Sequence, residues 1–277
     1  MKYINFLILI IRPLNTLIAF FSIFVVYSLL PGFDISVFIL IALVLFCYMS
    51  GGYILNDFLD IEVDKINKPH RALVQYTINH YVIIIFIITF FVIGTLIANL
   101  LSPLSRDIAI YIALPGIITY EFIFKRIALI GNIIISILVG LVFVYSEAAI
   151  TGDVEITYKI MILAFILNLI REIIKDIQDE KGDRAHYFKT LPIIIGIPGT
   201  IYIIRFISSV FFIVSLLFTS QFISPFFLPL IFFIIHLPLL YINLRLTDNI
   251  SSKECARFSN ILKLMIIGGV LIVLILA

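Results

Sequence analysis

The chain has 277 residues, of which 62% are hydrophobic and only 13% are charged. A soluble domain is typically about half apolar and about a quarter charged, so this composition excludes a soluble globular protein. The formal net charge of +2 is too small to indicate a nucleic-acid partner, and two cysteines cannot form a disulfide scaffold. The composition is that of a membrane protein with several spans.

Apolar segments of roughly 20 residues, the length that crosses a bilayer, follow one another along the chain. They lack the alternation of barrel strands, so we expect an all-α bundle of nine transmembrane helices. The expected spans lie near residues 9–30, 35–56, 79–101, 105–124, 129–150, 156–178, 192–219, 225–246 and 257–277. Residues 221–225 should divide the long uncharged stretch 206–244, because Pro225 cannot continue the preceding helix.

Positive charges are distributed unequally between the two sides of this predicted bundle. Of the 19 Lys and Arg residues, 16 fall on the side of the amino terminus, whereas only Arg106 and Lys159 fall on the opposite side. Because positively charged loops remain in the cytoplasm, we expect a cell-membrane protein with a cytoplasmic amino terminus and an outer carboxyl terminus. Two Asp-rich segments, 56–71 and 171–184, fall in the predicted cytoplasmic loops and cap the bundle.

Each Asp-rich segment contains three aspartates spaced by three and then four residues. They are Asp57, Asp60 and Asp64 in the first segment and Asp176, Asp179 and Asp183 in the second, each 119 residues after its counterpart. This spacing predicts three carboxylates on one face of a helix, where they repel one another unless a cation binds. Oxygen ligands without nearby His or Cys favour Mg²⁺ or Ca²⁺ over zinc. The shared spacing indicates an internal duplication within a single domain covering residues 1–277.

Six carboxylates are more than one Mg²⁺ requires, and Mg²⁺ commonly shares its site between carboxylates and substrate phosphates. Basic residues near the two segments can neutralise the remaining phosphate charge; they are Lys68, Arg71, Lys125, Arg126, Lys181, Arg184 and Lys189. We therefore expect Mg²⁺, with two ions, on a diphosphate. The simpler interpretation, that the segments are solvated loop charges, is disfavoured by the presence of two copies with the same spacing.

At these residues the sequence resembles the UbiA-type intramembrane prenyltransferases. Their first motif, NDxxDxxxD, is matched by Asn56, Asp57, Asp60 and Asp64, and its NxPxR continuation by Asn67, Pro69 and Arg71. Their second motif, DxxDxxxD, is matched by Asp176, Asp179 and Asp183. Residues 171–176, 189–193 and 12–15, and residues 125–126 followed by Gly131 and Asn132, resemble most the archaeal digeranylgeranylglyceryl phosphate synthase branch of that family.

The resemblance implies transfer of a geranylgeranyl group from its diphosphate to geranylgeranylglyceryl phosphate, which forms the second ether of an archaeal membrane lipid and releases diphosphate. It implies that the six aspartates hold Mg²⁺ and that Arg71 and Lys125 stabilise the leaving group. Substrate contacts are expected from Asn56, Asn15, Arg12, Asn67, Lys68, Asn168, Glu172, Lys175, Lys181, Arg184, Lys189 and Tyr120. Arg12, Lys175, Arg184 and Lys189 compete for the acceptor phosphate.

The sequence leaves two other functions open. An aromatic prenyltransferase of quinone or haem biosynthesis shares the donor chemistry, and the same basic residues suit a carboxylated or phenolic acceptor. A cation-coupled transporter places its acids near the bilayer midplane on broken helices, whereas these acids cluster at predicted helix ends. The expected partners are a prenyl diphosphate, a lipid-phase acceptor and membrane lipids, without nucleic acid.

Overall fold

The computed structural model describes residues 10–30, 34–76, 78–219 and 226–276. Within these ranges the regular elements are helices, apart from one isolated β-bridge between Ile127 and Lys189. The chain divides into two compact units, one formed by residues 1–124 and 141–157 and the other by residues 125–140 and 158–277. Each unit contains one Asp-rich segment. The organisation as a single domain with two related halves stays a prediction.

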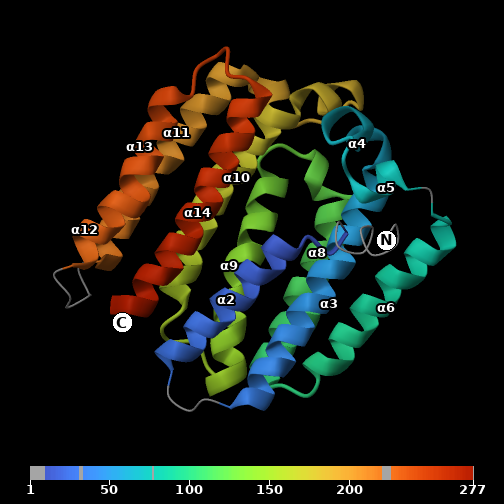
Figure 1. The fold of residues 1–277 in the computed structure, drawn as a ribbon, viewed down its shortest axis with the longest axis vertical. Coiled ribbons are helices and arrows are strands. Elements are labelled where there is room, and N and C mark those ends of the chain that lie inside the picture. The colour runs from blue at the N-terminus through green and yellow to red at the C-terminus, as the bar shows by residue number, and fades with distance from the viewer. Residues whose placement is uncertain (1–9, 31–33, 77, 220–225, 277) are drawn as a thin grey trace. The chain divides into compact units, whose positions relative to one another are not determined.

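The first unit is organised around the packing of two long helices. Its elements are α2 (Pro13–Leu29), α3 (Ile35–Leu59), α4 (Ile61–Asn67), α5 (Ala72–Gln75), α6 (His80–Ala98), α7 (Pro103–Asp107), the π-helix η1 (Ile108–Ala113), α8 (Leu114–Phe122) and the second half of α9 (Ile130–Thr151). Helices α3 and α6 lie side by side (Figure 1). They approach closely because Gly51 and Gly94 lack side chains: a Cβ on either would lie 2.7 Å from an aromatic ring of the other helix. This packing fixes the helix end that carries Asp57.

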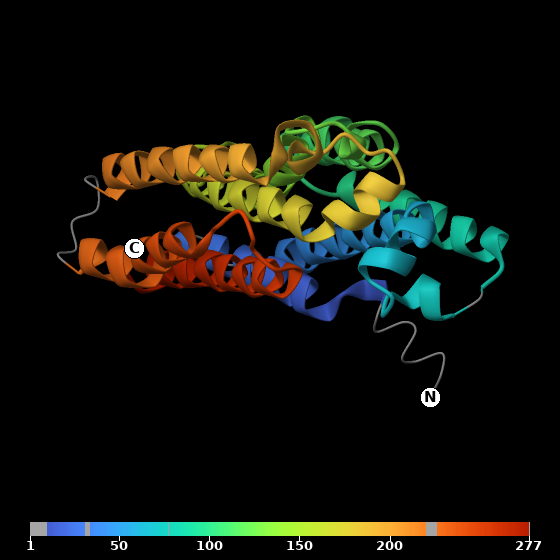
Figure 2. The same ribbon diagram turned by 90° about the horizontal axis from the view of Figure 1, so that it is seen from above.

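The second unit is organised around α10. Its elements are most of η2 (Phe124–Arg126), the first half of α9, α10 (Tyr158–Ala185), α11 (Leu191–Thr219), α12 (Phe227–Ile231), the π-helix η3 (Phe232–His236), α13 (Leu237–Arg245) and α14 (Ser252–Leu276). Helix α10 packs against both α11 and α14 (Figure 2). Ile170, Ile173 and Ile174 are fully buried at helical spacing, which makes one face of α10 the centre of the apolar core.

The helices occupy the predicted spans, with two boundary differences. In the described part of the chain, six helices are long and apolar enough to cross a membrane: residues 35–59, 80–98, 130–151, 191–218, 227–245 and 252–275. Of the other predicted spans, α2 has only 17 residues, α10 contains charges, and residues 103–122 are divided among α7, η1 and α8. Helix α10 continues to residue 185 and α14 begins at residue 252, because polar ends extend both helices beyond the apolar stretches. The predicted break at residues 221–225 lies outside the described residues.

Candidate active site

The first Asp-rich segment is broken where the spacing predicts one continuous helix. Helix α3 ends at Leu59, Asp60 adopts φ −101° and ψ 10°, and α4 begins at Ile61. Backbone hydrogen bonds nevertheless continue through the junction, from Asp60 to Asn56 at 3.0 Å and from Asp64 to Asp60 at 2.7 Å. The single continuous helix expected here is therefore divided into α3 and α4 at the middle aspartate, whereas the shared face of the three carboxylates stays a prediction.

The three aspartates of this segment are nevertheless buried together. Asp57, Asp60 and Asp64 are 1%, 9% and 3% exposed. Burial raises the pKa of the Asp64 carboxyl above its usual value, and the carboxylates of Asp60 and Asp57 raise that pKa further, whereas Lys68 and Arg71 lower it. A cation bound beside Asp64 would favour its charged form, which is the form that binds a metal ion.

Two guanidinium groups hold Asp57. The Arg12 Nη2 group donates to the Asp57 Oδ1 atom and also to Asn56 Oδ1 at 3.2 Å, and Arg71 Nη1 donates to the same Asp57 oxygen at 3.0 Å. Arg12 has a left-handed backbone, with φ 51°, and its guanidinium lies 4.4 Å from the centre of the Tyr53 ring. The other carboxylate oxygen of Asp57, Oδ2, is buried without a hydrogen-bond partner in the described structure. One oxygen is thus fixed by cations while the other remains available to a ligand.

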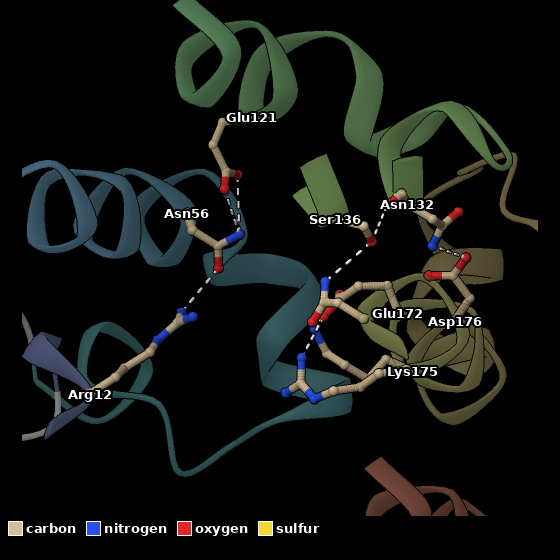
Figure 3. A network of polar contacts seen from close by, with 10 residues as sticks. Arg12, Asn56, Glu121, Asn132, Ser136, Glu172, Lys175 and Asp176 are labelled. Carbon is tan, nitrogen blue, oxygen red and sulfur yellow. Dashed lines mark hydrogen bonds and ion pairs between the residues drawn. The ribbon is translucent and has the colours of Figure 1, made fainter. Parts of the chain in front are cut away.

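The sequence prediction missed Glu121, a buried carboxylate of α8 in the same unit. The side-chain amide of Asn56 donates to both Glu121 oxygens, at 3.0 and 3.1 Å, while its carbonyl oxygen accepts from Arg12 (Figure 3). Glu121 is 6% exposed. The available signal was an acidic residue inside an otherwise apolar predicted span, which is uncommon in membrane helices unless the residue has a partner or a function.

The second Asp-rich segment lies on one continuous helix, as predicted. Helix α10 runs past Asp183 to Ala185, so its three aspartates share a face. Asp176 accepts a hydrogen bond from the Asn132 amide of α9 at 2.9 Å (Figure 3). Asn132 is 7% exposed; the sequence resemblance included this residue but gave it no role in the site. A neutral amide therefore orients this carboxylate.

A second polar chain in this unit supports the same region. The Asn168 amide donates to the Ser136 hydroxyl at 3.2 Å, and that hydroxyl donates to the Asn132 carbonyl oxygen at 2.6 Å. Asn168, which was predicted to contact substrate, therefore helps to hold α9 against α10. Its interaction with substrate stays a prediction.

Glu172 forms ion pairs with the two cations nearest to it on α10. Its two oxygens accept from Arg171 Nη1 at 2.5 Å and from Lys175 Nζ at 2.6 Å (Figure 3). Nearer the carboxyl end of α10, Arg184 pairs with Glu180 at 2.6 Å. Two of the cations predicted to bind phosphate are thus in ion pairs with carboxylates.

The remaining predicted site residues lie on several elements. In the first unit, Asn15 lies in the first turn of α2, Asn67 ends α4, Lys68 and Arg71 follow α4, and Tyr120 lies in α8. In the second unit, Lys125 lies in η2, Asp179 and the exposed Lys181 lie on α10, and Lys189 lies between α10 and α11. The structure brings Arg12, Asn56, Asp57 and Arg71 together in the first unit. In the second unit it brings Asp176 and Asn168 to the polar groups of α9.

The donor atoms suit Mg²⁺, although they do not form a preformed cage. Among the described residues, no three Asp, Glu, His or Cys side chains form a cluster that could hold a metal ion. The buried and unpartnered Asp57 Oδ2 is nevertheless a hard oxygen ligand facing no competing donor in the described structure. Mg²⁺ characteristically takes only one or two carboxylates and completes its octahedron with water and phosphate oxygens. The residues therefore fit a Mg²⁺ that arrives together with a phosphorylated substrate.

The sequence and the fold both match known proteins. The sequence matches the UbiA prenyltransferase family over residues 16–267. It is 33% identical to the digeranylgeranylglyceryl phosphate synthase of Methanothermobacter thermautotrophicus over 187 residues, which cover 68% of this chain and 66% of that protein. It is 32% identical to the synthase of Thermococcus sibiricus over 267 residues, which cover 93% of this chain and 91% of that protein.

A solved structure of known fold also resembles this chain. The structure of a UbiA homolog from Archaeoglobus fulgidus bound to GPP and Mg²⁺ matches with a TM-score of 0.75 and 19% identity, and the match covers 99% of both chains. At this identity the match shows a shared fold. The family match covers most of the chain and contains both Asp-rich segments. This multi-pass membrane protein therefore belongs to the UbiA prenyltransferase family.

Proposed function

We propose that this prenyltransferase transfers a geranylgeranyl group from geranylgeranyl diphosphate to geranylgeranylglyceryl phosphate. The observation that carries the proposal is the similarity to the Thermococcus sibiricus synthase over 93% of the chain, a range that must include both Asp-rich segments. The buried Asp57 with its orphaned oxygen and the amide-held Asp176 supply the polar chemistry that such a reaction requires.

The donor diphosphate is proposed to be held by both Asp-rich segments through two Mg²⁺ ions. The ligands would be Asp57, Asp60, Asp64, Asp176, Asp179 and Asp183. The Mg²⁺ in the Archaeoglobus fulgidus homolog supports this choice of metal. When bound, Mg²⁺ would neutralise charge on the departing diphosphate. That both segments serve one diphosphate is part of the proposal.

The chain's own cations contribute to the same task. Arg71 lies on the Asp57 carboxylate and, with Lys125, is proposed to bind diphosphate oxygens as negative charge develops on them. Arg12 shares that carboxylate oxygen and the Asn56 carbonyl oxygen, so its guanidinium is already oriented beside the first segment. Asn56 is proposed to orient these groups, since its amide is itself fixed by Glu121.

The proposed chemistry is a substitution at the first carbon of the donor. The bond between that carbon and the diphosphate oxygen breaks, and the allylic double bond stabilises the resulting positive charge. The acceptor hydroxyl oxygen then bonds to the carbon, the hydroxyl proton is lost, and diphosphate leaves. Water must be excluded because it would trap the cation as an alcohol, and the buried positions of Asp57, Asp60 and Asp64 are consistent with a sheltered site.

We further propose the membrane arrangement that the charge distribution predicts. The protein would have nine spans in a single domain, with the amino terminus and both Asp-rich segments on the cytoplasmic side and the carboxyl terminus outside. Cysteine accessibility tests this topology: single cysteines introduced at Lys65 and Lys159 in a chain lacking Cys47 and Cys255 should label from opposite sides of sealed vesicles. Labelling of both from one side would contradict the proposed topology.

A product assay tests the function directly. Purified enzyme with labelled geranylgeranyl diphosphate and Mg²⁺ is given either geranylgeranylglyceryl phosphate or 4-hydroxybenzoate, and the product is identified by mass. We expect the ether product and one diphosphate released per ether, with neither formed when EDTA removes the metal.

The alternative functions give different results in the same system. A prenylated 4-hydroxybenzoate without ether product would assign the chain to aromatic acceptors. Ion flux through liposomes without diphosphate release would indicate a transporter. Either result would overturn the proposal.

A further inference from the structure

Two loops of the second unit are joined through their backbones. The N–H of Lys189 donates to the carbonyl oxygen of Arg126 at 3.1 Å, and Ile127 and Lys189 form the parallel β-bridge. The guanidinium carbon of Arg126 lies 4.9 Å from the centre of the Phe188 ring. We call Arg126, Phe188, Lys189 and Thr190 the Arg126–Lys189 platform. Its backbone contacts place two cationic residues on neighbouring segments.

Both cations of the platform are exposed, and neither has an acidic partner in the part of the chain that the structure describes. Among the described residues, neither Arg126 nor Lys189 makes an ion pair, and the ranges outside those residues contain no Asp or Glu. Two cationic residues on backbone-joined segments, with no carboxylate partner among the described residues, make the platform favourable for an anion.

The other residues predicted to compete for the acceptor phosphate differ from Lys189 in this respect. They lie in the ion pairs Arg12–Asp57, Lys175–Glu172 and Arg184–Glu180. A phosphate that binds any of these three cations must compete with a carboxylate already in contact. At the platform, a phosphate meets no such competitor.

Two further features are unusual at this position. Thr190 is 5% exposed, and its hydroxyl has no hydrogen-bond partner in the described structure. Leu129 and Tyr187, which flank the bridged segments, have left-handed backbones with φ 65° and 59°. Buried hydroxyls without partners are rare, and strained backbone conformations cluster at binding and catalytic sites. These features indicate a segment shaped for a ligand.

The platform directly follows the second Asp-rich segment. The N–H of Phe188 donates to the carbonyl oxygen of Asp183 at 2.9 Å, and the N–H of His186 lies 3.1 and 3.2 Å from the carbonyl oxygens of Gly182 and Asp183. These bonds fold the loop back onto the end of α10. The two cations are therefore attached to the helix end that carries the last aspartate.

We propose that the Arg126–Lys189 platform binds the phosphate group of the lipid acceptor. The inference rests on the proposed function, which supplies an acceptor with a phosphate monoester. A guanidinium stacked on an aromatic ring presents its N–H donors at its edge, and that edge can bind two phosphate oxygens. Lys189 adds a second charge, and the Thr190 hydroxyl adds a donor.

The composition of the platform favours the acceptor over the donor, although both substrates carry phosphate. The platform contains no carboxylate, so it offers no ligand for the Mg²⁺ that accompanies the donor diphosphate. A phosphate monoester has between one and two negative charges near neutral pH, as a protein phosphate does, and two cations neutralise it without metal. The platform's own residues therefore favour a phosphate that binds without metal over the metal-dependent diphosphate.

Steady-state kinetics of the full chain test this assignment, with each substrate varied separately. The variants are Arg126→Gln, Lys189→Met and Thr190→Val, and the matched control is Lys253→Met, an exposed lysine of α14. We expect the KM for geranylgeranylglyceryl phosphate to rise roughly 10- to 100-fold in the first two and about threefold to tenfold in Thr190→Val. In all three variants the KM for geranylgeranyl diphosphate should change by less than about twofold. In the Lys253→Met control, both KM values should change by less than about twofold.

Binding and thermal unfolding provide readouts besides activity. Wild-type enzyme should bind geranylgeranylglyceryl phosphate more tightly than the same lipid without phosphate, and Arg126→Gln should remove that preference. Thr190→Val should not lower the unfolding temperature, because it removes a hydroxyl that has no internal partner.

Two results overturn the platform while leaving the proposed function intact. They are a rise in the KM for the donor instead of the acceptor, and unchanged KM values for both, each with normal ether formation by the wild type. Failure of the wild type to form any ether from this acceptor would instead overturn the proposed function together with the inference.

Discussion

The two Asp-rich segments share one spacing, but the first aspartate of each is held by a different kind of partner. In the first, the Asp57 carboxylate is held by the guanidinium groups of Arg12 and Arg71. In the second, the Asp176 carboxylate accepts from the neutral amide of Asn132. The backbone differs too, since α3 stops before the second aspartate of the first segment whereas α10 runs through all three of its own.

This difference has an electrostatic consequence for metal binding. The two guanidinium charges on Asp57 repel a divalent cation that approaches this carboxylate. This repulsion falls when an anion binds to the guanidinium groups. A diphosphate is such an anion, because guanidinium groups bind phosphate oxygens well. The Asn132 amide at Asp176 carries no charge, so it does not repel a cation and no anion has to bind to it first. We therefore expect the first segment to bind Mg²⁺ together with diphosphate and the second to bind Mg²⁺ more readily alone.

Removing either Asp57 or Asp176 should have the largest effect on activity. Asp57→Ala and Asp176→Ala should each reduce kcat for Mg²⁺-dependent ether formation by on the order of 1,000-fold, because each deletes a proposed metal ligand. Their unfolding free energies should differ: Asp57→Ala leaves two guanidiniums unpaired and should cost about 3–5 kcal/mol, whereas Asp176→Ala should cost about 1–3 kcal/mol. Initial rates and denaturant unfolding in detergent measure both quantities.

The half-exposed Asp107, which pairs with Arg106 in α7, provides the matched control for these substitutions. Asp107→Ala should retain wild-type kcat. Near-normal kcat in Asp57→Ala or Asp176→Ala at saturating Mg²⁺ would contradict the metal assignment. Equal destabilisation by the two substitutions would contradict the proposed difference between a charged and a neutral partner.

Mg²⁺ binding in the absence of diphosphate tests the comparison without catalysis. At about 100 times its dissociation constant, Mg²⁺ should stabilise the wild type by about 2.7 kcal/mol. Asp176→Asn should lose this stabilisation and Asp57→Asn should keep most of it; adding inorganic diphosphate should then reveal the defect in Asp57→Asn. Thermal unfolding against Mg²⁺ concentration measures the effect. The reverse order of sensitivity would show that the arginines do not hinder metal binding.

Much of the helical architecture could be predicted because its causes are local. The apolar stretches predicted the spans, and an unbroken helical period predicted the shared face of Asp176, Asp179 and Asp183. The interruption at Asp60 could not be predicted in the same way. Its local spacing is the same as in the second segment, so the outcome depends on packing around the end of α3.

The partners of the aspartates were less predictable because they come from distant parts of the chain. Asn56 and Glu121 are separated by 65 residues, and Asn132 and Asp176 by 44. Nothing in the sequence near either motif specifies which amide or carboxylate packs beside it. The sequence motifs identified the candidate ligands, whereas tertiary packing determined which side chains orient them.

Glu121→Gln should have a smaller effect, because Glu121 acts on the first segment through Asn56. A glutamine carries both a donor and an acceptor, so it would weaken the preference for the Asn56 amide orientation that presents oxygen to Arg12. We expect the Mg²⁺ concentration for half-maximal rate to rise about tenfold, as for loss of a hydrogen bond to a charged group. Rates measured across Mg²⁺ concentrations at saturating donor test this expectation.

Glu147 provides a structural comparison for Glu121 within the same unit. It is 2% exposed and accepts from the backbone N–H groups of Ile156 and Thr157, both at 2.9 Å. Glu147→Gln should lower the unfolding temperature without changing the Mg²⁺ requirement. If Glu121→Gln shows that same pattern, its role is only structural. An effect of Glu121→Gln that persists undiminished in an Asn56→Ala background would likewise contradict action through Asn56.

Asn132→Ala should have the smallest effect, because it removes a neutral hydrogen bond and leaves no unpaired cation beside Asp176. We expect the Mg²⁺ concentration for half-maximal rate to rise about threefold to tenfold, with kcat at saturating Mg²⁺ nearly unchanged. Asn243→Ala is the matched control, since the Asn243 amide donates to Ser208 and to the Leu239 carbonyl oxygen elsewhere in the same unit. That control should affect stability alone. A loss in Asn132→Ala as large as that in Asp176→Ala would mean that the amide does more than orient the carboxylate, and the contrast between a charged and a neutral partner would then fail.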